Sequence, residues 1–171
     1  MVRNNHQPDL PNPLDGPRSH APTPSGGRLN LLLSSAGYQP DPWAERLPRM
    51  LEPMGIRSHV ARSADAAEQV IAHNPIHIAV VDLALPLRGE PAAEEAGIRL
   101  LQLLARLASP PPTVVIKRRR TMRDDARELT AALKAGAFAV VDRPSAPSDL
   151  EHLLEVLRRC MTRHYKDQWP A

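Results

Sequence analysis

The sequence contains few aromatic residues and a single cysteine. Phe, Trp and Tyr make up 3% of the 171 residues, so any hydrophobic core has to consist mainly of aliphatic side chains. The single cysteine, Cys160, excludes a disulfide within the chain and is compatible with a reducing compartment. Without an adjacent base, Cys160 is expected to be a small buried residue rather than a nucleophile.

Long apolar runs are absent as well. No stretch approaches the ~20 apolar residues that span a bilayer, and the polar, Pro-rich N-terminal segment contains no hydrophobic signal core. We therefore expect a cytoplasmic protein without a membrane partner. The formal net charge of +3 is modest and does not by itself require a nucleic-acid partner.

The composition divides the chain into three parts. Residues 1–27 are rich in Pro, Asn, Ser and Gly and are predicted to be a disordered N-terminal arm. Residues 28–164 are predicted to form one domain, and residues 165–171 a C-terminal tail. This tail could pack onto the domain or bind a partner, and the sequence does not decide between these roles.

Within the domain, short apolar runs alternate with amphipathic segments. The runs are typical of buried strands and the segments of helices. Strict alternation predicts an α/β fold, a doubly wound, five-stranded parallel sheet with right-handed crossovers. Strand order 2-1-3-4-5 would make it a flavodoxin-like three-layer sandwich. Strands are expected at residues 29–35, 56–61, 76–86, 113–117 and 137–144, and helices at 41–55, 63–74, 94–108, 124–136 and 148–164.

Polar residues follow the predicted strands where each strand ends. Ligand sites in open parallel sheets form beyond the carboxyl ends of the strands. The central third strand ends at Asp82, which makes this carboxylate the focus of a candidate site. The residues expected around it are Ser34, Ser35, Lys117 and Arg143.

Two motifs resemble the receiver domain of bacterial two-component response regulators. The segment VVDLALP (80–86) resembles the phospho-acceptor strand of that family, and AGAFAVVDRP (135–144) resembles its fifth strand. The resemblance covers residues 29–163. It implies a receiver-like fold, phosphorelay signal transduction, and Asp82 at the phospho-acceptor position.

The same resemblance exposes departures at the site. Ser34 and Ser35 stand where receivers usually carry two acidic residues that hold Mg²⁺. Lys117 replaces a Ser or Thr, and Arg143 replaces the usual Lys. Mg²⁺ prefers carboxylate oxygens, and a cation beside Asp82 would compete with it. We therefore expect a degenerate pseudo-receiver that is not an enzyme, binds no cofactor or metal, and pairs Asp82 with a cation, Lys117 foremost.

Two alternatives stay open. The chain could be a single-domain response regulator that accepts phosphate on Asp82, and Mg²⁺ would then be its cofactor. Alternatively, the basic run KRRRTMR (117–123) could bind an anion or nucleic acid, although it lacks an aromatic stacking platform. The cations of this run are Lys117, Arg118, Arg119, Arg120 and Arg123.

The expected partner is another protein, because phosphorylation-independent signalling has to proceed through contacts. By resemblance it would be a histidine kinase or a downstream regulator, and a homodimer is also possible. Receivers use the surface of the fourth helix, fifth strand and fifth helix for such contacts. The seven histidines are scattered and expected at the surface, and the role of the loop after the third strand stays open.

Overall fold

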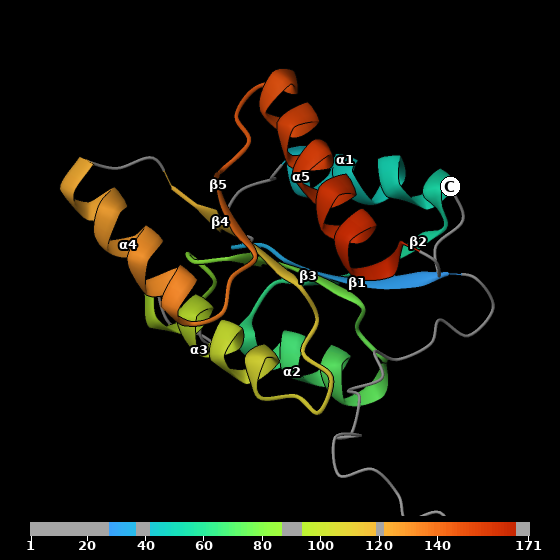
Figure 1. Ribbon diagram of the computed structural model, residues 1–171, viewed down its shortest axis with the longest axis horizontal. Helices are drawn as coiled ribbons and strands as arrows, with labels where there is room; N and C mark the ends of the chain where they lie inside the picture. Colours follow the sequence, from blue (N-terminus) through green and yellow to red (C-terminus); the bar gives the residue numbers. More distant parts are fainter. Residues whose placement is uncertain (1–27, 37–41, 87–93, 119–121, 167–171) are drawn as a thin grey trace, which may run out of the picture.

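The computed structural model describes residues 28–36, 42–86, 94–118 and 122–166 (Figure 1). Strands and helices alternate along the described chain, as predicted. The strands are β1 (Leu29–Ser34), β2 (Ile56–Ala61), β3 (Ile78–Asp82), β4 (Thr113–Lys117) and β5 (Ala139–Asp142). The helices are α1 (Pro42–Leu51), the short 3₁₀ helix η1 (Glu52–Met54), α2 (Ala64–His73), α3 (Glu94–Ala105), α4 (Met122–Lys134) and α5 (Pro147–Tyr165).

The strands form one parallel sheet in the order β2-β1-β3-β4-β5. Helices α1 and α5 cover one face of the sheet, and α2, α3 and α4 lie on the other (Figure 1). This arrangement confirms the predicted doubly wound, three-layer sandwich. Strand β3 lies at its centre and is buried along its whole length, which explains its uninterrupted apolar sequence up to Asp82.

The core is almost entirely aliphatic, as the scarcity of aromatic residues requires. On the α1/α5 face, leucines of β1 pack against leucines of both helices. Helix α5 ends on Tyr165, which is 3% exposed and donates its hydroxyl to the His77 carbonyl at 2.7 Å. The first tail residue therefore packs onto the domain. His77 is itself buried, so the expectation that all histidines lie at the surface was wrong.

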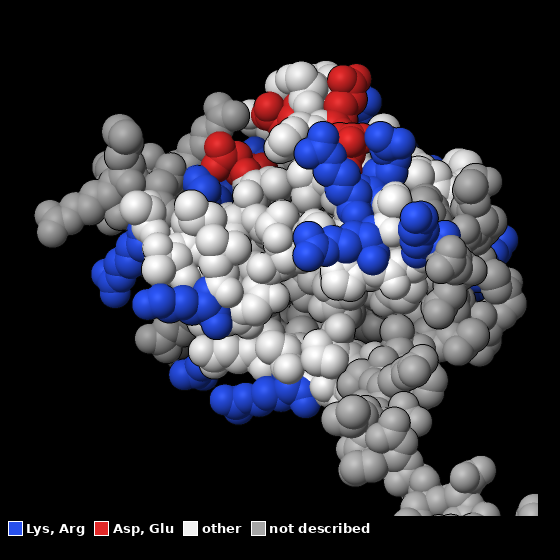
Figure 2. All heavy atoms as spheres, in the orientation of Figure 1, with Lys and Arg blue, Asp and Glu red and all other residues white. Residues whose placement is uncertain are grey.

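Helix ends differ from the sequence-based boundaries. Helix α3 ends at Ala105 instead of Ala108. Helix α5 begins at Pro147, one residue before the expected start at Ser148. Proline is favourable in the first helical position because its φ is already fixed. In this register Asp149 accepts hydrogen bonds from the backbone N–H groups of residues 145 and 146. Figure 2 shows acidic side chains gathered at this end of α5, where the positive end of the helix dipole favours them.

Helix α4 exposes two large apolar side chains. Among its side chains from residue 126 onward, only Ala132 is buried, whereas Leu129 and Leu133 are 40% and 49% exposed. In the described part of the chain, no helix combines the length and apolar character needed to cross a bilayer. The N-terminal arm (1–27), most of the loop after β3 (87–93) and Trp169 lie outside the described residues.

Candidate functional site at the carboxyl end of β3

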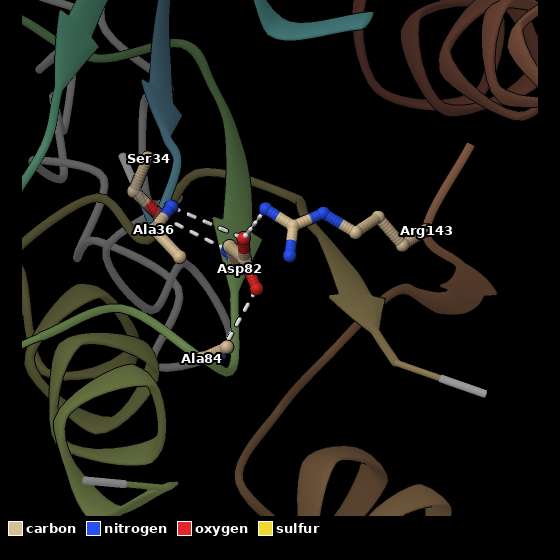
Figure 3. Close-up of polar contacts among 5 residues, drawn as sticks. All are labelled: Ser34, Ala36, Asp82, Ala84 and Arg143. Atoms are coloured by element: carbon tan, nitrogen blue, oxygen red, sulfur yellow. Dashed lines mark hydrogen bonds and ion pairs between the residues drawn. The ribbon is translucent and has the colours of Figure 1, made fainter. Parts of the chain in front are cut away.

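Asp82 is the last residue of β3, and its side chain is only 1% exposed. Its two carboxylate oxygens have different partners (Figure 3). Oδ1 accepts a hydrogen bond from the backbone N–H of Ala84 at 2.9 Å. Oδ2 accepts from the backbone N–H of Ala36 at 3.2 Å and from Nη2 of Arg143 at 3.1 Å. The buried carboxylate is thus satisfied by two backbone donors and one guanidinium group.

Ser34 connects β1 to the same strand end. Its buried hydroxyl oxygen accepts a hydrogen bond from the backbone N–H of Asp82 at 3.0 Å (Figure 3). Ser35 is also buried, at 2% exposure, and its backbone N–H donates to the Ala61 carbonyl of β2 at 3.0 Å. These two serines therefore join three neighbouring strands at the positions where the receiver resemblance implies metal-binding acids.

Arg143 reaches Asp82 because it directly follows β5, which runs parallel to β4. The backbone N–H of Arg143 donates to the Lys117 carbonyl at 2.7 Å, which holds this segment beside the end of β4. The guanidinium then extends toward β3, and its side chain is 23% exposed. An ion pair at about 4 Å has a gross Coulomb energy of about 4 kcal/mol at an effective dielectric constant near 20. Another cation could therefore bind Oδ2 of Asp82 only by displacing the Arg143 guanidinium.

Lys117 forms an ion pair with Asp142. Its Nζ lies 2.6 Å from Asp142 Oδ1, and the sheet register places these two residues directly opposite each other. Arg118 is exposed. The remaining cations of the predicted basic patch lie outside what the structure describes: Arg119 and Arg120 entirely, and Arg123 with its side chain.

Gly97 is a residue of the site that the sequence analysis did not identify. A Cβ atom at this position would lie 2.5 Å from the Leu83 Cα and 2.8 Å from the Asp82 carbonyl oxygen. Helix α3 can therefore cross the chain behind Asp82 only because residue 97 has no side chain. An isolated glycine inside a helical pattern is the signal that could have indicated this close approach.

The donors that the described residues supply at this site do not fit Mg²⁺, the ion that the receiver resemblance implies. Mg²⁺ requires near-octahedral oxygen ligands at about 2.0–2.1 Å. Asp82 is the carboxylate at this strand end, and both of its oxygens already accept hydrogen bonds. The Ser34 hydroxyl oxygen is engaged as an acceptor as well. Elsewhere in the described ranges, no group of three or more His, Cys, Asp or Glu side chains is placed to hold a metal.

Cys160 takes no part in this site. It is fully buried on α5, and burial raises the pKa of its thiol to about 12. A thiol with that pKa is almost entirely protonated near neutral pH, and the thiolate is the nucleophilic form. The prediction of a small buried core residue is confirmed.

Sequence comparisons find no relative: neither a protein-family model nor a curated protein matches the chain significantly. Solved structures do match. A signal receiver domain of an HD domain-containing protein from Pseudomonas fluorescens is similar at 18% identity and a TM-score of 0.63, covering 82% of this chain and 99% of its own. A response regulator receiver domain protein from Methanospirillum hungatei matches at 20% identity and a TM-score of 0.57, covering 80% and 98%.

A third similar structure contains a chemically modified site. It is a response regulator protein from Burkholderia pseudomallei with a phosphorylated aspartic acid, calcium ion and citrate. It matches at 19% identity and a TM-score of 0.56, covering 81% of this chain and 75% of that one. Together with the strand order 2-1-3-4-5, these similarities show that the chain has the fold of a response-regulator receiver domain.

Proposed function

We propose that the protein is a receiver-like signalling module that works without phosphorylation of Asp82. The observation that supports this most directly is the Arg143–Asp82 ion pair, 3.1 Å long, on a carboxylate that is 1% exposed. Phosphoryl transfer depends mainly on positioning and on neutralising charge, tasks that Mg²⁺ usually shares. Here a side chain of the protein already neutralises the carboxylate, while Ser34 and Ser35 supply no acidic ligand.

In this proposal the module acts through contacts with another protein. Support comes from α4, where Leu129 and Leu133 are exposed one helical turn apart. A single exposed leucine needs no explanation, but two of them on adjacent turns of one helix favour a contact surface. The cationic alternative is weakened because Lys117 is already paired with Asp142. The partner is expected to be a protein of the same signalling system or a second copy of this chain.

The phosphorylation part is tested with a small phosphodonor and Mg²⁺. Purified full-length protein is incubated with acetyl phosphate, and intact-mass spectrometry is used to detect an acid-labile phosphoryl adduct. We expect no adduct, and the same spectrum for the Asp82→Asn variant. An adduct on the wild type that Asp82→Asn abolishes would establish the phosphorylatable alternative.

A gain-of-function variant makes a negative result informative. Ser34→Asp, Ser35→Asp and Arg143→Lys together restore three of the four residue types that the receiver resemblance associates with phosphorylation, and Lys117 is left unchanged. If this triple variant binds Mg²⁺ in calorimetry and becomes labelled, the loss of chemistry lies in these positions. A labelled wild type with an unlabelled triple variant would contradict the proposal.

The contact surface is tested by sedimentation of the purified protein over a range of concentrations. If α4 mediates self-association, Leu129→Glu combined with Leu133→Glu should lower the sedimentation coefficient at high concentration. A matched control is Val60→Glu, an equally exposed apolar residue on the edge strand β2. Equal effects of both changes would argue against a specific surface on α4.

A further inference from the structure

A second candidate site lies at the opposite end of the sheet, where β1 and β2 begin (Figure 1). A groove of about 240 Å³ is formed there by the end of α1, the following 3₁₀ helix and the first residues of β2. The charged residues that line it are Arg28, Arg49, Arg57 and Glu52. Parallel strands place this groove at the far end of the sheet from Asp82, so the two sites are separate.

The lining of this groove carries uncompensated positive charge. Three arginines against one glutamate leave it with a net charge of +2. Among the residues that the structure describes, no ion pair neutralises Arg28, Arg49 or Arg57, unlike the cations near Asp82. Like charges that share a concave surface repel one another, and a bound anion relieves that repulsion.

An unsatisfied hydroxyl group contributes a second, independent observation. Ser58 also lines the groove, and its buried Oγ has no hydrogen-bond partner within the described chain. Buried polar atoms are almost always hydrogen-bonded, so an exception calls for an explanation. Because this oxygen is shielded from solvent, a ligand oxygen becomes its partner only if the Ser58 side chain turns toward the groove. Neighbouring Gly55, at φ 76°, ends the 3₁₀ helix and directs the chain into β2.

The size and charge of the groove select the ligand class. Its 240 Å³ lies below the ~300 Å³ at which pockets begin to hold drug-sized molecules, so it fits a small group. The planar guanidinium fork of arginine matches the oxygen geometry of phosphate. A phosphate monoester carries a charge of about −1.5 to −2 at pH 7, which balances the lining. We propose that this groove binds a phosphate monoester group or free phosphate.

The proposal is tested by titrating the full-length protein with inorganic phosphate and, separately, with glycerol 3-phosphate. Ionic strength is held constant with NaCl, and backbone amide shifts are followed by NMR. We expect saturable shifts centred on residues 55–58. Tighter binding of the ester would indicate an organic phosphate as the natural ligand, and tighter binding of inorganic phosphate would indicate the free ion. Either preference supports the site.

Three variants are expected to change the affinity for phosphate in three different ways. Arg49→Gln should weaken phosphate binding about tenfold, because it removes a charge-assisted contact at a partly solvated site. Glu52→Gln should strengthen binding by removing the opposing charge. Arg46→Gln is the matched control, since Arg46 is exposed on the same helix but does not line the groove. It should leave binding unchanged.

The proposal would be overturned by equal effects of Arg49→Gln and Arg46→Gln, by weaker binding in Glu52→Gln, or by shifts that NaCl alone reproduces. Circular dichroism of each variant verifies folding, and all three substituted residues are exposed. Asp82→Asn should not alter the phosphate titration. The groove could therefore fail while the proposed signalling role holds, or the reverse.

Discussion

The two ends of the sheet differ in whether their charged side chains form ion pairs. At the carboxyl end, Asp82 is paired with Arg143, and Lys117 with Asp142. At the amino end, the arginines that line the groove have no ion pair within the described chain. Open parallel sheets usually bind their ligands at the first of these ends. Among the described residues, the concave cluster of unpaired cations, which favours an incoming anion, lies at the second.

Burial makes this difference energetically important. The Asp82 side chain is 1% exposed, so its interactions are poorly screened by water, whereas Glu52 in the groove is exposed. A buried carboxylate is tolerated only when it is paired and hydrogen-bonded. Removing the Asp82 carboxylate should therefore cost stability. The charged groove residues at the amino end are exposed, so their charges should add little to stability and remain available for binding.

The largest expected effect comes from removing the buried carboxylate. Asp82→Ala should lower the free energy of unfolding by about 3–5 kcal/mol, because Arg143 and two backbone N–H groups lose their acceptor inside the protein. Glu52→Ala deletes the same charge at the exposed end and should change stability by no more than about 0.5 kcal/mol. Urea denaturation of the two variants measures both values.

Equal losses of unfolding free energy in these two variants would show that the two ends of the sheet do not differ in their contribution to stability. A stabilised Asp82→Ala variant would show that the carboxylate is strained by its surroundings. That result would favour a chemical role for the Asp82 carboxylate over a structural role in an ion pair. It would therefore also weaken the proposed phosphorylation-independent role.

A smaller effect is expected from adding one methyl group behind Asp82. Gly97→Ala places a Cβ atom 2.5 Å from the Leu83 Cα, so α3 must move away from the end of β3. Overpacking of this kind costs about 1–3 kcal/mol. The control Gln102→Ala alters an exposed position of the same helix and should be near neutral. Thermal denaturation compares the two, and equal melting temperatures would show that the close approach is unimportant.

The fold could be predicted from the sequence because burial dictates its pattern. A strand covered on both faces must be apolar throughout, and residues 78–81 show this directly. Helix ends were predicted less well. Their positions depend on a few local hydrogen bonds, such as those that Asp149 accepts from the backbone of residues 145 and 146, and sequence patterns do not show which of these form.

The candidate site could be predicted only in part. Topology alone brings Ser34, Asp82 and Arg143 to one edge, because parallel strands end on the same side. Which cation reaches Asp82 depends on sheet register: Lys117 lies opposite Asp142 and pairs with it, while Arg143 extends across. The arginine groove could not be predicted, since its residues come from a helix end and from strand starts, where sequence rules place no site.

The smallest expected effect is the change in the pKa of His59 when the nearby charge of Arg57 is removed. The pKa of His59 lies below its ordinary value of 6.5, mainly because the side chain is partly buried and secondarily because Arg57 is nearby. Arg57→Gln should raise this pKa while leaving it below 6.5, since burial remains. An NMR titration of the His59 ring protons measures the change, and Arg46→Gln is the control of equal charge.

The sign of the associated stability change follows from linkage. A histidine whose pKa is lowered by folding binds its proton more readily in the unfolded chain. The free energy of unfolding should therefore fall as the pH decreases from 6.5 through the pKa of folded His59, and fall less in Arg57→Gln. An unchanged His59 pKa in that variant would mean that solvent fully screens Arg57. Arg57 would then add little to the attraction of the groove for phosphate, and Arg28 and Arg49 would have to supply it.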